Sequence, residues 1–169
     1  MVELQLPKLA TRVRFPSPAP FFIFWYMNND LTKAKEILAQ GHAAAICKGD
    51  SVYTSDANGI KPLNWWLRDG YTFEGYSAAD KVVGRAAAFL YVLLKVKEIY
   101  AELLSESAVE VLEHYNIPYF FGKMVPNILN RTGDDLCPME KIALQHQEPE
   151  PAYEALKVKI AELMAGKTK

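Results

Sequence analysis

Few cysteines and little net charge distinguish this sequence. Its 169 residues include only two cysteines, Cys47 and Cys137, which are too far apart for a Cys-x-x-Cys pair. This argues against a disulfide framework and against a thiolate zinc site. The 19 basic and 20 acidic residues nearly cancel, and the sequence has no cluster of Lys and Arg of the kind that grips phosphates. We therefore expect a cytoplasmic protein that does not bind nucleic acid.

Long apolar runs are missing as well. The two longest, residues 20–27 and 86–94, are well short of the roughly 20 residues that span a bilayer. No small-residue cleavage pattern follows the first of them, so we expect neither a membrane span nor a signal peptide. Apolar residues nevertheless make up 50% of the sequence, which is enough to bury a core in one compact domain.

The first 26 residues differ from the rest of the chain. Residues 11–20 contain three prolines, which break helices and central strands, and this string resembles the translated T-arm of a transfer-RNA gene. A Pro-rich ligand for a partner's aromatic groove is the alternative. We expect residues 1–26 to be a disordered or mis-assigned extension, residues 27–147 to form the domain, and residues 148–169 to form a linker and a C-terminal helix.

Helical and strand-like patterns alternate along the domain. Asp30 is a suitable N-cap for the first predicted helix, and residues 48–50 suit the turn of a hairpin. The predicted helices cover residues 31–40, 62–67, 80–94, 105–114, 137–146 and 152–165. The predicted strands cover residues 43–47, 51–54, 96–103 and 117–121. This alternation is typical of a three-layer α/β/α sandwich, here with an extra C-terminal helix.

Two strings carry a resemblance to a known family. The first is ADKVVGRAAA at residues 79–88, and the second joins NRTG at residues 130–133 to CPME at residues 137–140. The chain is thereby similar to domain of unknown function 1893, an uncharacterised family placed in the cytidine-deaminase-like superfamily. The resemblance extends over residues 30–142 and implies that superfamily's fold, but it supplies no activity.

Deaminases of this fold begin the central helix with His-x-Glu or Cys-x-Glu and the next helix with Pro-Cys-x-x-Cys, because three ligands must surround one zinc ion. Here Ala78 stands in the first ligand position, two residues before Asp80, and residues 104–108 contain no cysteine. The resemblance therefore implies a zinc-free domain, and we expect no metal and no other cofactor. An unconventional metal site made by Asp80, Cys137 and Glu140 is the alternative.

The predicted start of the central helix contains the first group of candidate site residues. In the simplest interpretation, Ser77 and Asp80 form a capping box. In the functional interpretation, a polar strip on this helix faces a ligand. Lys81 and Arg85, four residues apart, would repel each other unless an anion lay between them. Gly84 weakens a helix and indicates either close packing or close approach of a ligand.

Cys137 begins the second group. It precedes Pro138, and proline is favoured at the first helical position, so the thiol lies at a helix N-terminus, where thiols become more reactive. The preceding loop brings Asn130 and Arg131 toward the same place, although its two acids, at positions 134 and 135, oppose thiolate formation. A buried structural cysteine is the alternative.

Two functions follow from these residues. In the first, the domain binds a small anionic metabolite or a nucleotide as a small-molecule ligand, and turnover is left open. Its candidate catalytic residues are Asp80, Lys81 and Cys137, and its candidate ligand-binding residues are Ser77, Gly84, Arg85, Asn130 and Arg131. In the second, the domain is a non-catalytic binding or scaffold module that forms a homo-oligomer through its apolar last helix. The first hypothesis requires five side chains to meet at one cavity, namely Asp80, Lys81, Arg85, Arg131 and Cys137.

Overall fold

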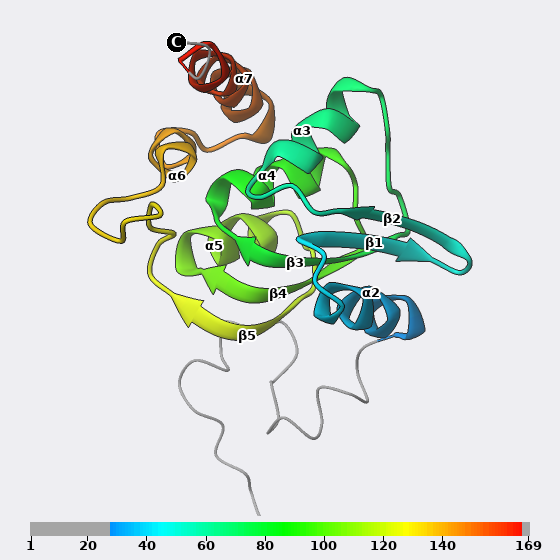
Figure 1. The fold of residues 1–169 in the computed structure, drawn as a ribbon. Coiled ribbons are helices and arrows are strands. Elements are labelled where there is room, and N and C mark those ends of the chain that lie inside the picture. The colour runs from blue at the N-terminus through cyan, green and yellow to red at the C-terminus, as the bar shows by residue number, and fades with distance from the viewer. Residues whose placement is uncertain (1–27, 167–169) are drawn as a thin grey trace, which may run out of the picture.

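The computed structural model describes residues 28–166 and shows a mixed α/β fold (Figure 1). The expectations for residues 1–26 lie outside the described residues. The described helices are α2 (Asn29–Ala39), α3 (Lys61–Arg68), α4 (Arg85–Leu93), α5 (Glu106–His114), α6 (Pro138–Ala143) and α7 (Pro149–Ala165). The strands are β1 (Ala44–Lys48), β2 (Ser51–Ser55), β3 (Ser77–Val83), β4 (Glu98–Ser105) and β5 (Tyr119–Val125). The predicted α/β class is confirmed.

The five strands form one sheet in the order β2-β1-β3-β4-β5. Strand β1 is antiparallel to both of its neighbours, β2 and β3. Strands β3, β4 and β5 are parallel to one another, and α4 and α5 connect them. The carboxyl ends of these three strands therefore meet at one edge of the sheet.

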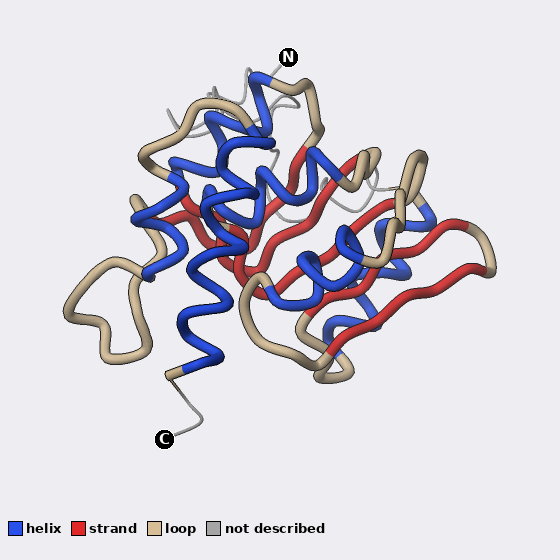
Figure 2. The backbone as a smooth tube through the Cα atoms, turned by 90° about the horizontal axis from the view of Figure 1, so that it is seen from above, coloured by secondary structure: helices blue, strands red, loops and turns tan. Residues whose placement is uncertain are grey.

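Helices cover the two faces of the sheet unequally. Helix α2 lies on one face, where its buried residues Leu31, Ala34 and Leu38 pack with Ala79 of β3. The other helices lie on the opposite face, where α4 packs against α3, α5, α6 and α7. Figure 2 shows this layer from above, with the helix that leads to the C-terminus lying over it. Leu156 of α7 is fully buried in this larger core, so α7 contributes to the same core as the sheet.

The predicted helix at residues 80–94 is wrong in its first part. Residues Ser77–Val83 form the central strand β3, and α4 begins only at Arg85, with Gly84 at its N-cap. A strand buried on both faces is almost continuously apolar, and its pattern is hard to distinguish from that of a buried helix. The predicted capping box of Ser77 and Asp80 is therefore wrong, because neither residue lies at a helix start.

The starts of α2 and α7 also differ from the predicted starts. The N-cap of α2 is Asn28, whose Oδ1 accepts a hydrogen bond from the Leu31 amide at 2.9 Å, and the predicted cap Asp30 lies in the first turn. Helix α7 begins at Pro149, within the predicted linker, because proline is tolerated in a first helical turn.

Locally specified elements agree with the prediction. The hairpin of β1 and β2 is confirmed, as is the short helix α3. Helix α5 has the predicted cap, since Ser105 Oγ accepts a hydrogen bond from the Ala108 amide at 3.1 Å. None of the helices in the described part of the chain combines the length and apolar character needed to cross a bilayer.

Candidate functional site

The carboxyl edge of β3, β4 and β5 is the place to look for a site, because open α/β sheets usually bind ligands beyond the carboxyl ends of their strands. In this chain β3 leads into α4 at Gly84, and β4 leads into α5 at Ser105. Strand β5 leads into a long loop that ends at α6. The segment 126–147 therefore lies beside the starts of α4 and α5.

A buried carboxylate from α6 lies between the starts of α4 and α5. Glu140 is only 2% exposed, and its carboxylate accepts hydrogen bonds from the Arg85 amide at 2.8 Å and from Ser107 Oγ at 2.6 Å. Ser105 Oγ donates to it at 3.3 Å. The positive N-terminal end of a helix dipole stabilises a carboxylate, so Glu140 caps α4 and is hydrogen-bonded to both serines at the start of α5.

The close approach of Glu140 explains Gly84. A Cβ atom at position 84 would lie 2.5 Å from Glu140 Oε2 and 2.8 Å from Ile128 Cγ1. Real Cβ atoms do not approach other atoms so closely. Of the two interpretations of Gly84, close packing therefore accounts for the glycine without a ligand.

Arg85 is committed to internal contacts. The residue is 5% exposed, and its guanidinium donates to the Glu110 carboxylate at 3.0 Å and to the His146 carbonyl at 3.1 Å. Further hydrogen bonds reach the Ala143 and Ser107 carbonyls and the side chain of Gln147. Arg85 therefore fastens α4 to α5 and to the end of α6, and its donors are occupied.

Three other predicted site residues lie away from this edge or are already engaged. Lys81 Nζ donates to the Gly41 carbonyl, just after α2, at 3.2 Å. Ser77 lies at the opposite end of β3, where its hydroxyl donates to Glu98 at 2.6 Å. Asn130 accepts from the Gly133 amide at 2.8 Å within its own loop. Lys81 and Arg85 therefore do not meet Cys137 at one cavity, and the ligand site as predicted from the sequence is wrong.

Asp80 forms a buried pair with Tyr91 of α4. The Tyr91 hydroxyl donates to Asp80 Oδ2 at 2.7 Å, and Asp80 is 8% exposed. Burial raises the pKa of Asp80 to about 6, although hydrogen bonds from Tyr91 and from the Val82 and Lys81 amides act in the opposite direction. Burial and the neighbouring Asp80 charge raise the pKa of Tyr91 well above its ordinary value. This pair lies inside the domain between β3 and α4.

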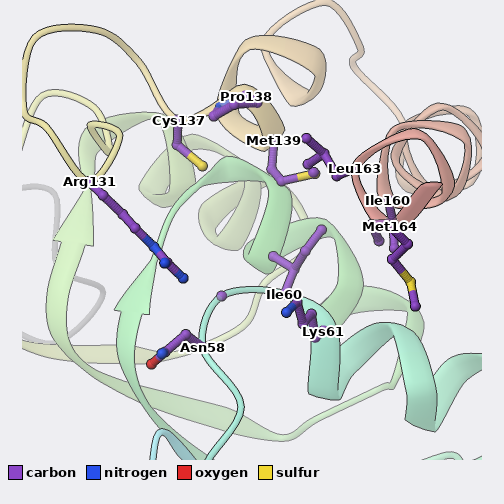
Figure 3. A pocket seen from close by; sticks show the side chains of 11 residues that line it. Asn58, Ile60, Lys61, Arg131, Cys137, Pro138, Met139, Ile160, Leu163 and Met164 are labelled. Atoms are coloured by element: carbon purple, nitrogen blue, oxygen red, sulfur yellow. The ribbon is translucent and has the colours of Figure 1, made fainter. Parts of the chain in front are cut away.

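Cys137 and Arg131 do line a common cavity (Figure 3). The cavity, which we name the Arg131 pocket, has a volume of about 640 Å³, within the usual size of small-molecule sites. Three segments far apart in the sequence surround it together with Arg131. They are residues 58–61 at the start of α3, residues 137–139 at the start of α6, and Ile160, Leu163 and Met164 near the end of α7.

The charges of the Arg131 pocket have one sign. Arg131 and Lys61 are its two charged lining residues among those described, and neither forms an ion pair or a side-chain hydrogen bond there. The two acids of the neighbouring loop do not line the pocket. Asp135 pairs with Lys141, whereas Asp134 accepts hydrogen bonds from Thr132 and Asn130 and keeps its charge. These contacts lower the pKa values of both carboxyl groups. The charged side chains that line the pocket are therefore both cationic.

Comparison with known proteins gives the family. The chain matches the model "TM1506: Domain of unknown function (DUF1893)" over residues 33–160. The chain belongs to this family. A solved structure of a DUF1893 family protein, TM1506 from Thermotoga maritima, is similar, with a TM-score of 0.72 and 25% sequence identity, and the match covers 79% of this chain and 92% of that chain. A search of the curated proteins found no match.

The described residues of this DUF1893 chain hold no ready metal site. Nowhere among them do three His, Cys, Asp or Glu side chains gather closely enough to bind an ion. The alternative site of Asp80, Cys137 and Glu140 is wrong, because Tyr91 engages Asp80 and because Ser107 and the Arg85 amide engage Glu140.

A second groove of the DUF1893 domain lies at the same edge of the sheet. It has a volume of about 560 Å³, and most of its lining is apolar, including Val82, Leu103 and Leu129. Asn130 lines this groove rather than the Arg131 pocket. The two neighbours Asn130 and Arg131, which the sequence suggested for one site, thus face two different cavities.

No pattern in the sequence predicted Lys61, Met139 or the apolar end of α7 as pocket residues of the DUF1893 domain. Lys61 precedes Pro62 at a helix start, a context that indicates only local structure. Residues from α3, α6 and α7 come together only through the packing of these helices around α4. A pattern within one segment does not carry this information.

Proposed function

We propose that this DUF1893 chain is a zinc-free, deaminase-like domain that binds a small anionic metabolite in the Arg131 pocket. The observation that carries the proposal is the pair Arg131 and Lys61. Both line one cavity of about 640 Å³ with no acidic lining residue among those described. Unpaired cations in a cavity are stabilised by an anion, and arginine binds carboxylates and phosphates through two parallel hydrogen bonds.

The strand order supports the deaminase-like part of the proposal. A hairpin is followed by three parallel strands with helical crossovers, in the order β2-β1-β3-β4-β5. The zinc ligands of a deaminase belong at the starts of α4 and α5. Because α4 begins at Arg85, the residues to consider are Gly84, Arg85 and Ala86 rather than Ala78 to Asp80. None of them is a zinc ligand, and the start of α5, Ser105-Glu106-Ser107, contains no cysteine.

The buried cluster at these helix starts also supports a domain without zinc. Glu140, Ser105 and Ser107 occupy the space between α4 and α5 and satisfy one another by hydrogen bonds. Such a network favours a stable helix junction over an open metal site. The ligand pocket therefore lies outside this junction, one turn away along α6.

Binding is favoured over turnover. Cys137 is the one thiol that lines the Arg131 pocket, and within residues 28–166 no hydrogen bond joins it to a base. A nucleophilic cysteine usually requires such a base or a lowered pKa. The other two catalytic candidates do not line this cavity.

A second candidate function is a scaffold that dimerises through α7. Val158 of α7 is 61% exposed, and the pocket-lining Leu163 and Met164 are 43% and 63% exposed. Light scattering coupled to gel filtration distinguishes the two proposals. A dimer that dissociates on Val158→Asp substitution favours the scaffold, whereas a monomer removes it.

The test of anion binding is a nuclear magnetic resonance titration of the full chain with inorganic phosphate and with acetate. We expect saturable shifts at residues 131, 61 and 137 that disappear in the double variant Arg131→Ala, Lys61→Ala. The matched control is Arg68→Ala, which removes an exposed arginine of α3 that does not line the pocket. Equal responses from the wild type and the double variant would overturn the proposal.

A further inference from the structure

We infer that the ligand of the Arg131 pocket is an amphipathic anion with an aliphatic body and a carboxylate or phosphate head. This inference rests on the proposed function and extends it to the chemical class of the ligand. It depends on how polar and apolar side chains divide the walls of the cavity.

The walls of the Arg131 pocket are chemically different on opposite sides. Figure 3 shows Arg131 and Asn58 on one side of the cavity, and Lys61 beside Ile60 between that side and α7. Apolar side chains stand on the other side, contributed by Met139 of α6 and by Ile160, Leu163 and Met164 of α7. A ligand that satisfies both sides has its charge at one end and an apolar body at the other.

The apolar wall is exposed without a ligand. Leu163 is 43% exposed and Met164 is 63% exposed. Covering such side chains removes apolar surface from water and stabilises a complex. Methionine side chains adapt to ligands of different shapes, and two methionines line this wall. The wall therefore favours a ligand whose apolar part is a flexible hydrocarbon chain over one with a rigid ring system.

The lining also disfavours a nucleobase, although the proposed function leaves nucleotides open. None of the described residues that line the Arg131 pocket is aromatic. Proteins recognise free bases largely by stacking them on aromatic side chains and by hydrogen bonds to their edges. Asn58 offers one side-chain amide for such hydrogen bonds. An aliphatic chain requires neither a stacking partner nor additional polar groups.

The head of the ligand belongs beside Arg131. Its guanidinium fits a carboxylate or a phosphate equally well in geometry, and Lys61 supplies a second positive charge to the same cavity. The two sources of the head are distinguished by comparing hexanoate with hexyl phosphate. Tighter binding of hexyl phosphate that is lost in Lys61→Ala indicates that both cations contact the head.

The test measures affinity across a homologous series by nuclear magnetic resonance titration of the full chain with acetate, butyrate, hexanoate and octanoate at constant ionic strength. We expect affinity to rise about fourfold for each added methylene, the ratio that corresponds to about 0.8 kcal/mol per buried CH₂. Leu163→Asn is expected to flatten this dependence and to leave acetate binding unchanged. The control is Leu144→Asn, at a similarly exposed leucine that does not line the pocket. We expect this variant to retain the dependence of affinity on chain length.

The possible results separate this inference from the proposed function. An affinity that is the same for acetate and octanoate, yet is lost in Arg131→Ala, overturns the aliphatic body and leaves the anion site intact. A dependence on chain length that persists in Leu163→Asn also overturns the inference. If neither phosphate nor any alkanoate binds, the proposed function and the inference both fail. Because Leu163 is exposed, its substitution does not compromise folding.

Discussion

Glu140 Oε2 accepts a hydrogen bond from the backbone amide of Arg85 at 2.8 Å, across 55 residues of sequence. Through this contact a carboxylate from the short helix α6 closes the start of the central helix α4. Ser107 Oγ, at the start of α5, donates to the same carboxylate at 2.6 Å. Three helices are therefore joined at one buried acid.

The first prediction concerns this acid. Glu140→Gln retains the size of the side chain but removes the charge-assisted hydrogen bonds, so we expect the free energy of unfolding to fall by about 1–3 kcal/mol. Urea unfolding measures the change. The control is Glu154→Gln, which breaks an exposed ion pair with Lys157 and should cost less than about 0.5 kcal/mol. Equal losses in the two variants would show that Glu140 is not a buried cap.

The second prediction concerns Gly84. A methyl group there would lie 2.5 Å from Glu140 Oε2 and 2.8 Å from Ile128, so Gly84→Ala should reduce the free energy of unfolding by about 1–3 kcal/mol through overpacking. Gly166→Ala is the matched control, because its nearest neighbour is an ordinary 3.5 Å away. Because Gly84 contacts Glu140, the losses in free energy of unfolding caused by Gly84→Ala and Glu140→Gln should not add in the double variant. Strict additivity would contradict the contact.

The third prediction concerns the pH dependence of stability. Burial raises the pKa of Asp80 from 3.8 to about 6, so between these values the folded state binds more protons than the unfolded state. Protonation of Asp80 therefore contributes about 3 kcal/mol to the free energy of unfolding. The contribution is fully present below about pH 4 and is lost as the pH rises through about 6. We expect Asp80→Asn, compared with the wild type by urea unfolding at pH 4 to 7, to remove it.

Tyr91→Phe tests the same Asp80 carboxyl group by raising its pKa instead of removing it. The Tyr91 hydroxyl stabilises the charged form of Asp80 and lowers its pKa. Removing the hydroxyl should raise the pKa of Asp80 further, so the loss of stability with rising pH should extend above pH 6. Both expectations are contradicted if the free energies of unfolding of the wild type and Asp80→Asn differ by the same amount at pH 4 and at pH 7.

The fourth prediction concerns the two thiols. Cys137 lines the Arg131 pocket and is partly exposed, whereas Cys47 is fully buried and burial raises its pKa. We expect iodoacetamide to alkylate Cys137 at least about tenfold faster than Cys47, as followed by mass spectrometry of peptides. Saturating octanoate should slow the reaction at Cys137 alone. Equal protection of both thiols would indicate general stabilisation rather than occupancy of the pocket.

Features that depend only on residues adjacent in the sequence were predictable. Ser105 as the cap of α5 and Lys48-Gly49-Asp50 as the hairpin turn follow from local chemistry, and both are found. The boundary between β3 and α4 was not predictable. Sheet pairing with β1 and β4 gives residues 77–83 an extended conformation, and this tertiary effect overrides their helix-like apolar pattern.

The candidate site was predicted in part. The sequence suggested Arg131 and Cys137 from the loop before α6, and the structure places both at one pocket. It also suggested Arg85 as a ligand-binding residue, whose guanidinium instead bonds to Glu110 and to backbone carbonyls of other segments. The partners of Arg85 lie 22 to 62 residues away along the chain, so the sequence around Arg85 does not reveal them.

Helix α6 has only six residues, yet it serves two environments. Cys137 and Met139 face the Arg131 pocket, whereas Glu140 faces the junction of α4 and α5. Since one short helix and its N-cap carry both sets of side chains, we expect occupancy of the pocket and opening of the junction to be energetically coupled. If an anion binds in the Arg131 pocket and holds α6 in place, we expect slower exchange of the Arg85 amide with solvent deuterium, at a site that the anion does not touch.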